Sequence, residues 1–404
     1  MNEKLTLSVI KADVGSVGGH TKPSENMLSV CRDLIWSAIN KKALCDGLVT
    51  HTGDDIAIWA FGEALKDSGL KKEDIDGLIV QPSFGNLGDI KMVGHRLGLE
   101  PKVAANVGHA GQSIQFAAML VNSGFCNYCA CMYGTNQRTN RNRFAGSAYH
   151  MSGNFDEVYG LSNPGAVAAF NYRRRMKDFG ATERQLGAIA VAQSKAASLN
   201  PLAVYKGPLT IEDYMNTRYV IEPLRLVDFC MVSDGGFCAI VTTPERAKAL
   251  KKTPVYITGM GAQASFMELE HPRAMYHPSQ VPNAKMLWEN SGLTPKDMDG
   301  LLAQDAYTPN VMAALENYGF CEFGTAHEWI QGGRIELGGE FPTNFHGGQN
   351  RFSYMVGWHN TYDAVKQLRN EAQERSRQIP NAEHILCTYS TGHWQETWSV
   401  IYRR

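Results

Sequence analysis

Polar side chains that could bind a ligand and move protons gather in one glycine-rich stretch late in the chain. Asn344, His346 and Tyr354 bracket Gly347 and Gly348, so hydrogen-bonding groups stand beside backbone that a ligand can approach closely. Tyrosine and histidine can act as acids or bases, and backbone N–H groups can donate to a developing negative charge. The stretch therefore predicts a binding or catalytic site. From these residues alone, a surface loop in which His346 and Tyr354 serve only packing stays open.

A second candidate site is the turn between a short strand and a helix. The pattern of apolar residues predicts a strand over residues 102–106 and an amphipathic helix that ends near Asn122. The first N–H groups of such a helix are free to bind an anion. Gly108 leaves space there, and His109 and Ser113 are the side chains of the turn that could do chemistry. A single histidine in such a place is more often structural.

An internal repeat places the glycine-rich stretch in the second of two related halves. Residues 68–81 recur as residues 291–304, an offset of 223 residues, and both copies contain Asp-x-Asp-Gly-Leu. Each copy follows an amphipathic segment and ends in an apolar one. This order is typical of a helix, a glycine C-cap, a short turn and a buried strand. A separation near half of the 404 residues predicts two related α/β halves rather than a short-period solenoid.

Composition and charge exclude several classes of function. The chain is 44% hydrophobic and 20% charged, with 39 basic and 40 acidic side chains, as in an ordinary globular protein. The net charge of −1 gives no reason to expect a nucleic-acid partner. No apolar run reaches the about 18 residues that a membrane span needs, and the N-terminus does not read as a signal peptide. We therefore expect a cytoplasmic protein.

The cysteines are expected to be reduced thiols. Their number, nine, is odd, and several stand in apolar runs. Cys126, Cys129 and Cys131 have spacing that invites a zinc interpretation. They fall within residues 125–133, however, which read as a buried strand, and no second pair of ligands follows. We predict no metal at this place.

Carboxylates and a histidine near the N-terminus are of the types that bind Mg²⁺. The first 55 residues resemble the start of the archaeal-type fructose-1,6-bisphosphate aldolase/phosphatases, in residues 8–16, 19–20 and 50–55. That resemblance implies the magnesium ligands Asp13, His20, Asp54 and Asp55. It ends at Asp55, and the later parts of that family's site have no counterpart. We therefore predict an appended βαβ-like segment over residues 1–55 that does not form a working phosphatase.

The remaining residues, about 56–404, resemble the thiolase superfamily, and within it the sterol-carrier-protein-type thiolases with their lipid-transfer-like and aldolase relatives. The motifs that carry the resemblance are Asn200-Pro-Leu-Ala203, Leu209-Thr-Ile-Glu-Asp213, Pro223-Leu-Arg-Leu-Val-Asp-Phe-Cys230, Ser233-Asp-Gly-Gly236, Gln304-Asp-Ala-Tyr307, Leu315-Glu-Asn-Tyr-Gly319, Leu337-Gly-Gly-Glu-Phe-Pro-Thr-Asn344, His346-Gly-Gly348 and Ala364-Val-Lys-Gln-Leu-Arg369. The resemblance implies an α/β fold in which two related βαβ halves, residues 56–253 and 254–404, form a layered αβαβα arrangement.

Departures from the family pattern decide the expected chemistry. Where thiolases carry a nucleophilic cysteine at the start of a helix, this chain has Val107-Gly-His109. Acyl transfer through a covalent intermediate needs that thiolate. A histidine expected after the double glycine is replaced by Tyr354, and the C-terminal Cys-Gly region reads Ser390-Thr-Gly-His393. Tyr354 matches the aldolase-type relatives, and a phenol could deprotonate a β-hydroxyl and start a retro-aldol cleavage.

The sequence thus predicts an enzyme of lipid metabolism that makes or breaks a C–C bond in an acyl-CoA thioester, with no tightly bound cofactor. The predicted catalytic residues are Tyr354, His109, His393, Tyr307 and His346, and the predicted substrate-binding residues are Asn344, Gly347, Gly348, Gly108, Ser113 and Asp305. Three alternatives stay open: an acetyl-CoA acetyltransferase-type acyl transfer, a non-catalytic CoA-thioester-binding or scaffold subunit, and a fructose-1,6-bisphosphatase. The resemblance further implies a homodimer and a small partner protein with a zinc ribbon and an OB-fold.

Overall fold

The computed structural model describes most of the chain after the N-terminal segment, namely residues 53–82, 90–138, 163–265, 276–373, 376–390 and 396–404. Two compact units divide it. The first takes the chain up to Gly108 together with Phe116–Arg143 and Val232–Lys252. The second takes His109–Gln115, Phe144–Met231 and Thr253–Arg404.

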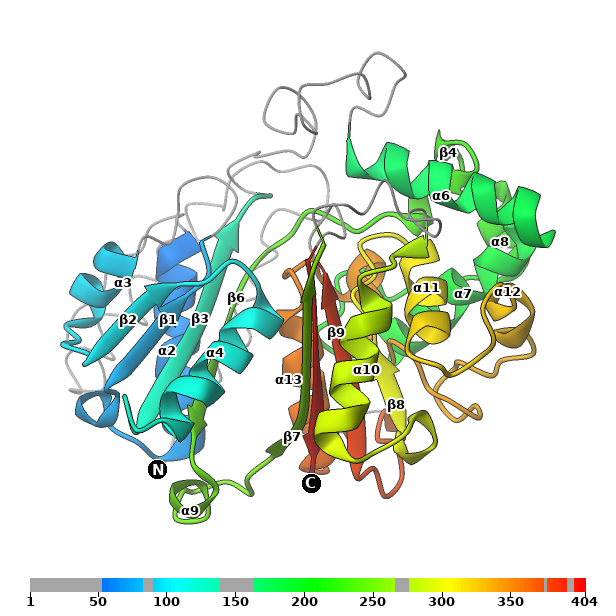
Figure 1. Cartoon of the computed structure of the whole chain (residues 1–404). Coiled ribbons are helices and arrows are strands. Elements are labelled where there is room, and N and C mark those ends of the chain that lie inside the picture. The colour runs from blue at the N-terminus through cyan, green and yellow to red at the C-terminus, as the bar shows by residue number, and fades with distance from the viewer. Residues whose placement is uncertain (1–52, 83–89, 139–162, 266–275, 374–375, 391–395) are drawn as a thin grey trace, which may run out of the picture. The chain divides into compact units, whose positions relative to one another are not determined.

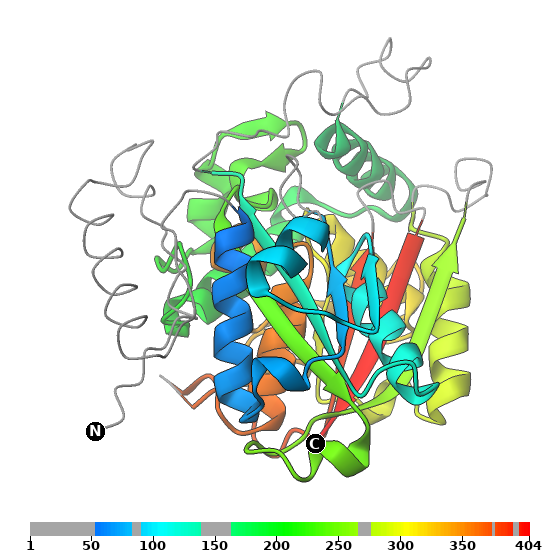
Figure 2. The same cartoon turned by 90° about the vertical axis from the view of Figure 1, so that its left-hand side faces the viewer.

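The first unit is built on a four-stranded sheet in the order β2-β1-β3-β6 (Figure 1). Its strands are β1 (Gly77–Val80), β2 (Val103–Asn106), β3 (Tyr128–Asn136) and β6 (Asp234–Thr242). Strand β1 pairs in parallel with β2 and β3, and β6 runs antiparallel to β3. Helix α2 (Gly53–Ser68) lies along β3 and β6 (Figure 2), and its Ala57 and Phe61 share a core with Leu78 and Met132. The other helices are η2 (Lys72–Asp74), α3 (Ile90–Leu97), α9 (Pro244–Ala247) and the later turns of α4 (Ala110–Asn122).

The second unit holds a sheet in the order β7-β10-β9-β8. Its strands are β7 (Tyr256–Ala264), β8 (Gly300–Leu302), β9 (His384–Ser390) and β10 (Glu396–Arg403). Strand β8 is parallel to β9, while β10 is antiparallel to both β9 and β7. Helices α10 (Gln280–Ser291) and α13 (Trp358–Leu368) pack on this sheet, and Figure 1 shows them on its two faces. The remaining elements are α6 (Pro164–Phe179), α7 (Glu183–Leu199), α8 (Ile211–Asn216), β4 (Tyr219–Ile221), β5 (Leu224–Arg225), η4 (Leu226–Asp228), η7 (Pro295–Asp297), α11 (Pro309–Asn317), α12 (Ala326–Trp329) and the π-helix η8 (Gly348–Phe352).

Helix α7 carries side chains into the candidate site, and local sequence fixes where it starts. Thr182 caps it by accepting a hydrogen bond from the N–H of Gln185, whose side chain in turn accepts from the N–H of Thr182. This reciprocal capping box satisfies N–H groups that the first helical turn leaves without partners. The preceding helix, α6, ends at Phe179 and is capped by Gly180, which has φ +72° and adopts it without a Cβ penalty. The C-cap Gly180 and the N-cap Thr182 are two residues apart, and together they set the start of α7.

The repeat predicts equivalent strands, and the structure confirms this down to single hydrogen bonds. Asp76 accepts the N–H groups of Asn127 and Tyr128 at 2.7 and 2.9 Å. Asp299 accepts those of Glu383 and His384 at the same two distances. In each half a carboxylate thus ties the start of the repeat strand, β1 or β8, to the start of its parallel neighbour, β3 or β9.

The other aspartate of the motif also has one role in both copies. Asp74 accepts the N–H of Lys71, and Asp297 accepts the N–H of Thr294, both at 2.7 Å. These bonds close the short helices η2 and η7, which precede the repeat strands. The Asp-x-Asp pattern is therefore structural in both halves.

The equivalence extends to the segments that lead into the two candidate sites. Leu78 of β1 pairs with Ala104 of β2, and Leu301 of β8 makes a single parallel bridge to Thr343. Thr343 therefore stands where β2 stands in the first half. In both halves a candidate site follows this position within a few residues: His109 after β2, and the glycine pair after Thr343.

Several predictions for the N-terminal segment fall outside the described residues. Asp13 and His20 lie there, and so do the side chains of Asp54 and Asp55. Helix α2 begins at Gly53, so the backbone of these two aspartates belongs to its first turn rather than to the end of a strand. The appended segment and the domain boundaries at residues 55 and 253 stay predictions. Among the helices of the described ranges, none has both the length and the apolar character needed to cross a membrane.

Candidate active site

The stretch from Asn344 to Gly357 concentrates unusual backbone conformations. Asn344 and Val356 both have φ +48°, and Gly347, Gly348 and Gly357 have φ +111°, +66° and +89°. A β-branched residue in the left-handed region is a steric outlier that costs about 1–3 kcal/mol and persists only where the surroundings enforce it. Between these positions the chain forms the π-helix η8, a rare element that is often found at functional sites. The conformation of this stretch is thus imposed by the fold.

Asn344 fastens the start of the stretch to strand β8. Its N–H donates to the carbonyl of Leu301 at 2.9 Å, and its side-chain oxygen accepts the N–H of Ala303 at 2.7 Å. The side chain is 1% exposed, and its remaining amide group favours the ionised form of the buried Asp305. Asn344 therefore positions the glycine turn and interacts with the carboxylate of Asp305.

His346 closes the glycine turn through both of its ring nitrogens. Nδ1 accepts the N–H of Gly348 at 2.9 Å, which leaves the proton on Nε2, and Nε2 lies 2.8 Å from Oδ1 of Asn360. Asn360 is itself fixed, because its amide donates to the carbonyl of Leu302 at 3.1 Å. Burial lowers the pKa of His346. These contacts favour a positioning role over the proton transfer predicted for His346.

The N–H groups of Gly347 and Gly348, which we predict from the sequence to donate to a substrate oxygen, both have partners within the chain. The N–H of Gly347 donates to the carbonyl of Asn344 at 2.9 Å, and that of Gly348 is taken by His346. Glycine is required here for a different reason. A Cβ on Gly347 would lie 2.7 Å from the Cβ of Ala197 on α7, and a Cβ on Gly348 would overlap Asp305. The double glycine therefore allows close packing against α7 and Asp305.

Asp305 is a buried carboxylate beneath this turn. It is 2% exposed, accepts the side-chain amide of Gln193 on α7 at 2.5 Å, and accepts the N–H of Gln349 at 3.1 and 3.2 Å. Burial raises the pKa of Asp305 to about 7, and the hydrogen bonds oppose that rise. Asp305 therefore holds η8 against α7, and its charge changes near neutral pH.

The raised pKa of Asp305 gives a testable dependence of stability on pH. An unfolded aspartate titrates near a pKa of about 3.9, so between that value and about 7 the folded chain binds more protons than the unfolded chain. The contribution of Asp305 to the free energy of unfolding therefore falls as pH rises through this interval. We expect an Asp305→Asn variant, which cannot ionise, to lose less melting temperature than the wild type between about pH 5 and pH 8. Thermal melts of both proteins measure this, and an equal or steeper decline in the variant would contradict it.

His109 stands directly before helix α4, where the family pattern has its nucleophilic cysteine. The side chain is 3% exposed, stacks on Trp398 with ring centroids 5.2 Å apart and meets Tyr389 edge-on at 6.2 Å. Burial lowers the pKa of His109 to about 3, so the imidazole is neutral at physiological pH. No hydrogen bond of ordinary geometry reaches either ring nitrogen from the described residues, but the backbone of Ser390 lies close enough to oppose the lowering of the His109 pKa by burial. Ser113 is fully buried one turn further on, and its N–H donates to the carbonyl of His109 at 2.8 Å.

Tyr389 brings the start of α4 and the Tyr354 segment together. A Cβ on Gly111 of α4 would overlap the Tyr389 ring, and a Cβ on Gly357 would lie 2.6 Å from it. The ring is therefore clamped between two glycines, and its hydroxyl lies 2.7 Å from the hydroxyl of Thr361 on α13. Tyr354 is 6% exposed in the turn just before Gly357. One side chain of β9 thus links the segments that carry His109 and Tyr354.

The other predicted residues are placed less centrally. Tyr307 follows Asp305 by two residues, is partly buried, and meets Phe229 edge-on with ring centroids 5.3 Å apart. Gly108 is exposed just before His109. His393 lies outside the described residues. Tyr307 and His393 stay predictions.

Sequence reasoning missed the side chains that support the site. Nothing in the sequence marks these residues as part of a site, because each is an ordinary residue of a helix or strand until the fold brings it to Asp305 or His109. They are Gln193, Gln349, Tyr389 and Trp398. The spacing of Gln193 in α7 could at most have placed it on the buried face of that helix.

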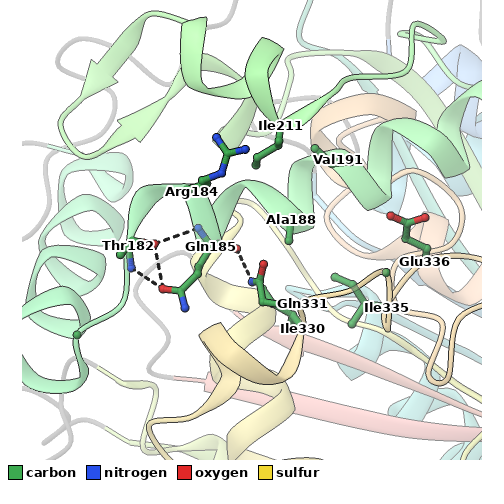
Figure 3. Close-up of a pocket in the computed structure, with 12 residues that line it drawn as sticks. Thr182, Arg184, Gln185, Ala188, Val191, Ile211, Ile330, Gln331, Ile335 and Glu336 are labelled. Atoms are coloured by element: carbon green, nitrogen blue, oxygen red, sulfur yellow. Dashed lines mark hydrogen bonds between the residues drawn. The ribbon is translucent and has the colours of Figure 1, made fainter.

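A surface cavity of about 580 Å³ lies on the other face of α7 (Figure 3). Ala188 and Val191 of α7 line it together with Ile335, and Arg184 and Glu336 stand at it. These α7 positions lie about half a turn around the helix from Gln193, which points to Asp305. The cavity is therefore separate from the Tyr354 segment.

The cysteines of the described ranges belong to no metal-ligand set. Cys126, Cys129 and Cys131 are buried, and burial raises the pKa of Cys126 to about 12. Within the described ranges, no three His, Cys, Asp or Glu side chains converge in a way that could hold a metal ion.

Comparisons with known proteins agree with this geometry. The sequence model of the thiolase C-terminal domain-like family matches residues 272–404, and that of fructose-1,6-bisphosphatase matches residues 4–80. The 17-hydroxy-3-oxo-4-pregnene-20-carboxyl-CoA lyase of Mycobacterium tuberculosis is 34% identical over 355 residues, covering 83% of this chain and 91% of the relative. The steroid side-chain-cleaving aldolase of Thermomonospora curvata is 33% identical, covering 81% and 88%. A solved structure named Ltp2-ChsH2(DUF35) aldolase has a TM-score of 0.79 at 31% identity, covering 87% of this chain and 93% of that chain.

Proposed function

The chain belongs to the thiolase superfamily, and from that premise we propose that it cleaves a C–C bond in a β-hydroxyacyl-CoA thioester by a retro-aldol reaction, with Tyr354 as the base. One observation carries the proposal. The strained turn that holds Tyr354 meets, at Tyr389, the start of a helix that carries His109 instead of a cysteine. The names of the two relatives, a CoA-thioester lyase and an aldolase, describe the same class of reaction.

The proposed reaction needs one base and one stabiliser of negative charge. Tyr354, in its phenolate form, takes the proton of the β-hydroxyl, the C–O bond becomes a carbonyl, and the bond between the α and β carbons breaks. The electron pair of that bond moves to the α carbon as a thioester enolate. The proton taken up by Tyr354 then returns to the α carbon, directly or through water, which gives the shortened acyl-CoA and restores the phenolate. In the productive complex the Tyr354 oxygen must lie within about 3 Å of the β-hydroxyl, directly or through one water. No covalent acyl-enzyme forms, so no thiolate is needed.

His109 is the group best placed to stabilise the enolate. A neutral imidazole still carries one N–H, and stacking on Trp398 fixes the direction of the ring. The first N–H groups of α4 add partial positive charge at the same end of the helix. This assignment replaces the glycine pair, whose N–H groups are engaged elsewhere. Donors of this kind typically contribute about 3 kcal/mol to transition-state stabilisation.

Product analysis tests the reaction class. With 17-hydroxy-3-oxo-4-pregnene-20-carboxyl-CoA as the probe, we expect one ketone and one shortened acyl-CoA per substrate, without added CoA and without loss of rate after treatment with iodoacetamide. Cleavage that occurs only on a 3-ketoacyl-CoA, requires free CoA and is stopped by thiol alkylation would instead establish acyl transfer. Binding of CoA without turnover on either substrate would support the scaffold alternative.

We also propose an assembly of a homodimer with a second, smaller subunit. The solved relative is named as a complex of two components, Ltp2 and ChsH2(DUF35), which supports a partner protein. The zinc-ribbon and OB-fold character of that partner is part of the proposal. The edge strands of the described sheet are β2 and β6, so an edge-to-edge dimer would pair through one of them.

The match of residues 4–80 to fructose-1,6-bisphosphatase supports a separate origin for the N-terminal segment. The implied ligands, Asp13, His20, Asp54 and Asp55, come from one end of that family's site. A diphosphate substrate would need further acidic and basic groups. We therefore propose that this segment does not add a phosphatase activity.

A further inference from the structure

The π-helix η8 carries three successive polar residues whose side chains are incompletely paired. Gln349 is fully buried, and neither atom of its amide has a hydrogen-bond partner among the described residues. Asn350 is 7% exposed; its amide nitrogen donates to the carbonyl of Val227 at 2.7 Å, but its oxygen has no partner in the same set. An unpaired buried polar atom costs about 1–3 kcal/mol, so such atoms are normally satisfied by water or by a ligand.

Arg351, the next residue, is a half-buried cation without a counter-ion. No carboxylate of the described chain lies within ion-pair distance of its guanidinium, whereas the buried Arg175 and Arg377 each have one, Glu316 and Asp363. Burial lowers the pKa of Arg351, but arginine stays protonated at any physiological pH. A partly desolvated positive charge is costly unless an anion compensates it.

Hydrogen bonds to a neighbouring segment fix the backbone around Arg351, and this fixes where its side chain begins. The carbonyl of Arg351 accepts the N–H of Tyr205 at 3.1 Å, and that of Phe352 accepts the N–H of Val204 at 3.3 Å. Lys206 follows Tyr205 directly and is exposed, and its Nζ donates to the carbonyl of Pro201 at 2.7 Å. It places a second positive charge on the segment that pairs with the backbone of Arg351. Tyr354 lies three residues beyond Arg351, so cationic and catalytic residues belong to one short segment.

We propose that η8 binds the CoA moiety of the thioester. Arg351 binds one of the phosphate groups of CoA, and the Gln349 carboxamide pairs with an amide of its pantetheine arm. This inference rests on the proposed function, since it names how that same site holds its substrate. A carboxamide offers one donor and one acceptor direction, which suits a secondary amide. A guanidinium forms paired hydrogen bonds with phosphate oxygens. Amides and phosphates occur together in CoA.

A carboxylate on the acyl part could also satisfy Arg351. The phosphate is favoured because the two paired segments carry two cations, Arg351 and Lys206, and Lys206 is exposed to solvent. The reacting carbon must approach Tyr354, whereas the charged end of CoA stays near solvent. A multiply charged group at the outer end matches this distribution better than a single carboxylate.

Calorimetric binding of CoA and of pantetheine, which lacks phosphate, tests the inference without relying on turnover. We expect Arg351→Gln to weaken CoA binding by about 10- to 100-fold and thereby to remove most of the preference for CoA over pantetheine. Arg351→Lys, which keeps the charge but not the paired geometry, should fall between the wild type and Arg351→Gln. Arg173→Gln is the matched control, because Arg173 is exposed and paired with Glu222. Thermal melts verify that each variant is folded.

The outcomes separate this inference from the proposed function. If the wild type binds CoA and Arg351→Gln binds it equally well, the phosphate assignment is wrong while the aldolase proposal stands. If Arg351→Gln weakens pantetheine and CoA by the same factor, Arg351 does not read the phosphate. If the wild type binds no CoA at all, the proposed function itself fails.

Discussion

Tyr354→Phe is expected to reduce retro-aldol turnover by about 10²- to 10⁴-fold, the range that a positioned acid or base contributes. The substitution keeps the ring, and with it the packing of a side chain that is 6% exposed. It removes only the oxygen that takes the proton of the β-hydroxyl. We therefore expect a large loss in kcat, a small change in KM and a nearly unchanged melting temperature. Steady-state kinetics on the β-hydroxyacyl-CoA, with a thermal melt, measure all three.

Two variants frame this result. Tyr256→Phe removes a hydroxyl from a partly buried tyrosine on β7 and should leave turnover unchanged. His109→Ala removes the proposed enolate donor and should cost less than the loss of the base, because the N–H groups of α4 remain. Full activity of Tyr354→Phe, together with inactivation by a thiol reagent, would show that a cysteine carries the reaction and that the aldolase assignment is wrong.

Gly348→Ala is expected to damage both stability and activity. Gly348 has φ +66°, and an added Cβ would overlap Asp305 and lie 2.6 Å from the Gln193 amide nitrogen. Relief requires the carboxylate to move, and with it Gln349 and the whole of η8. Small misplacements of this kind can lower turnover by about 10²-fold.

Gly332→Ala is the matched control for that collision. Gly332 has φ +70°, nearly the same backbone, but nothing lies within 4 Å of an added Cβ. In Gly332→Ala the free energy of unfolding should fall by about 1–2 kcal/mol, from backbone strain alone. In Gly348→Ala it should fall by about 1–3 kcal/mol more, because the added methyl group overpacks the site. Denaturant unfolding of the two variants measures the difference, and equal destabilisation would show that the contact with Asp305 does not matter.

The sequence predicted those features that a local pattern encodes. The repeat identified equivalent strands, because capping aspartates and glycine C-caps contact residues that are close to them in the sequence. Tyr354 was singled out because it replaces a histidine in a recognisable motif, and its catalytic role stays a prediction. The helix at Ala110 followed from apolar periodicity and a small-residue turn.

What the sequence could not predict depends on long-range contacts. Whether the N–H groups of Gly347 and Gly348 face a substrate was decided by His346 and Asn344, which take them first. The raised pKa of Asp305 follows from burial against α7, which begins more than a hundred residues earlier in the chain. Likewise, nothing local indicated that Arg351 has no counter-ion among the described residues.

The paired bonds of Asp76 and Asp299 have a consequence for the history of the molecule. Two carboxylates that make the same contacts in both halves are simplest to explain as copies of one ancestral unit, duplicated and fused. The turn after the β2 position then diverged: one copy became a helix start that bears His109, and the other the glycine turn that leads to Tyr354. The reaction centre would therefore be assembled from two descendants of a single loop, each of which took over a different part of the chemistry.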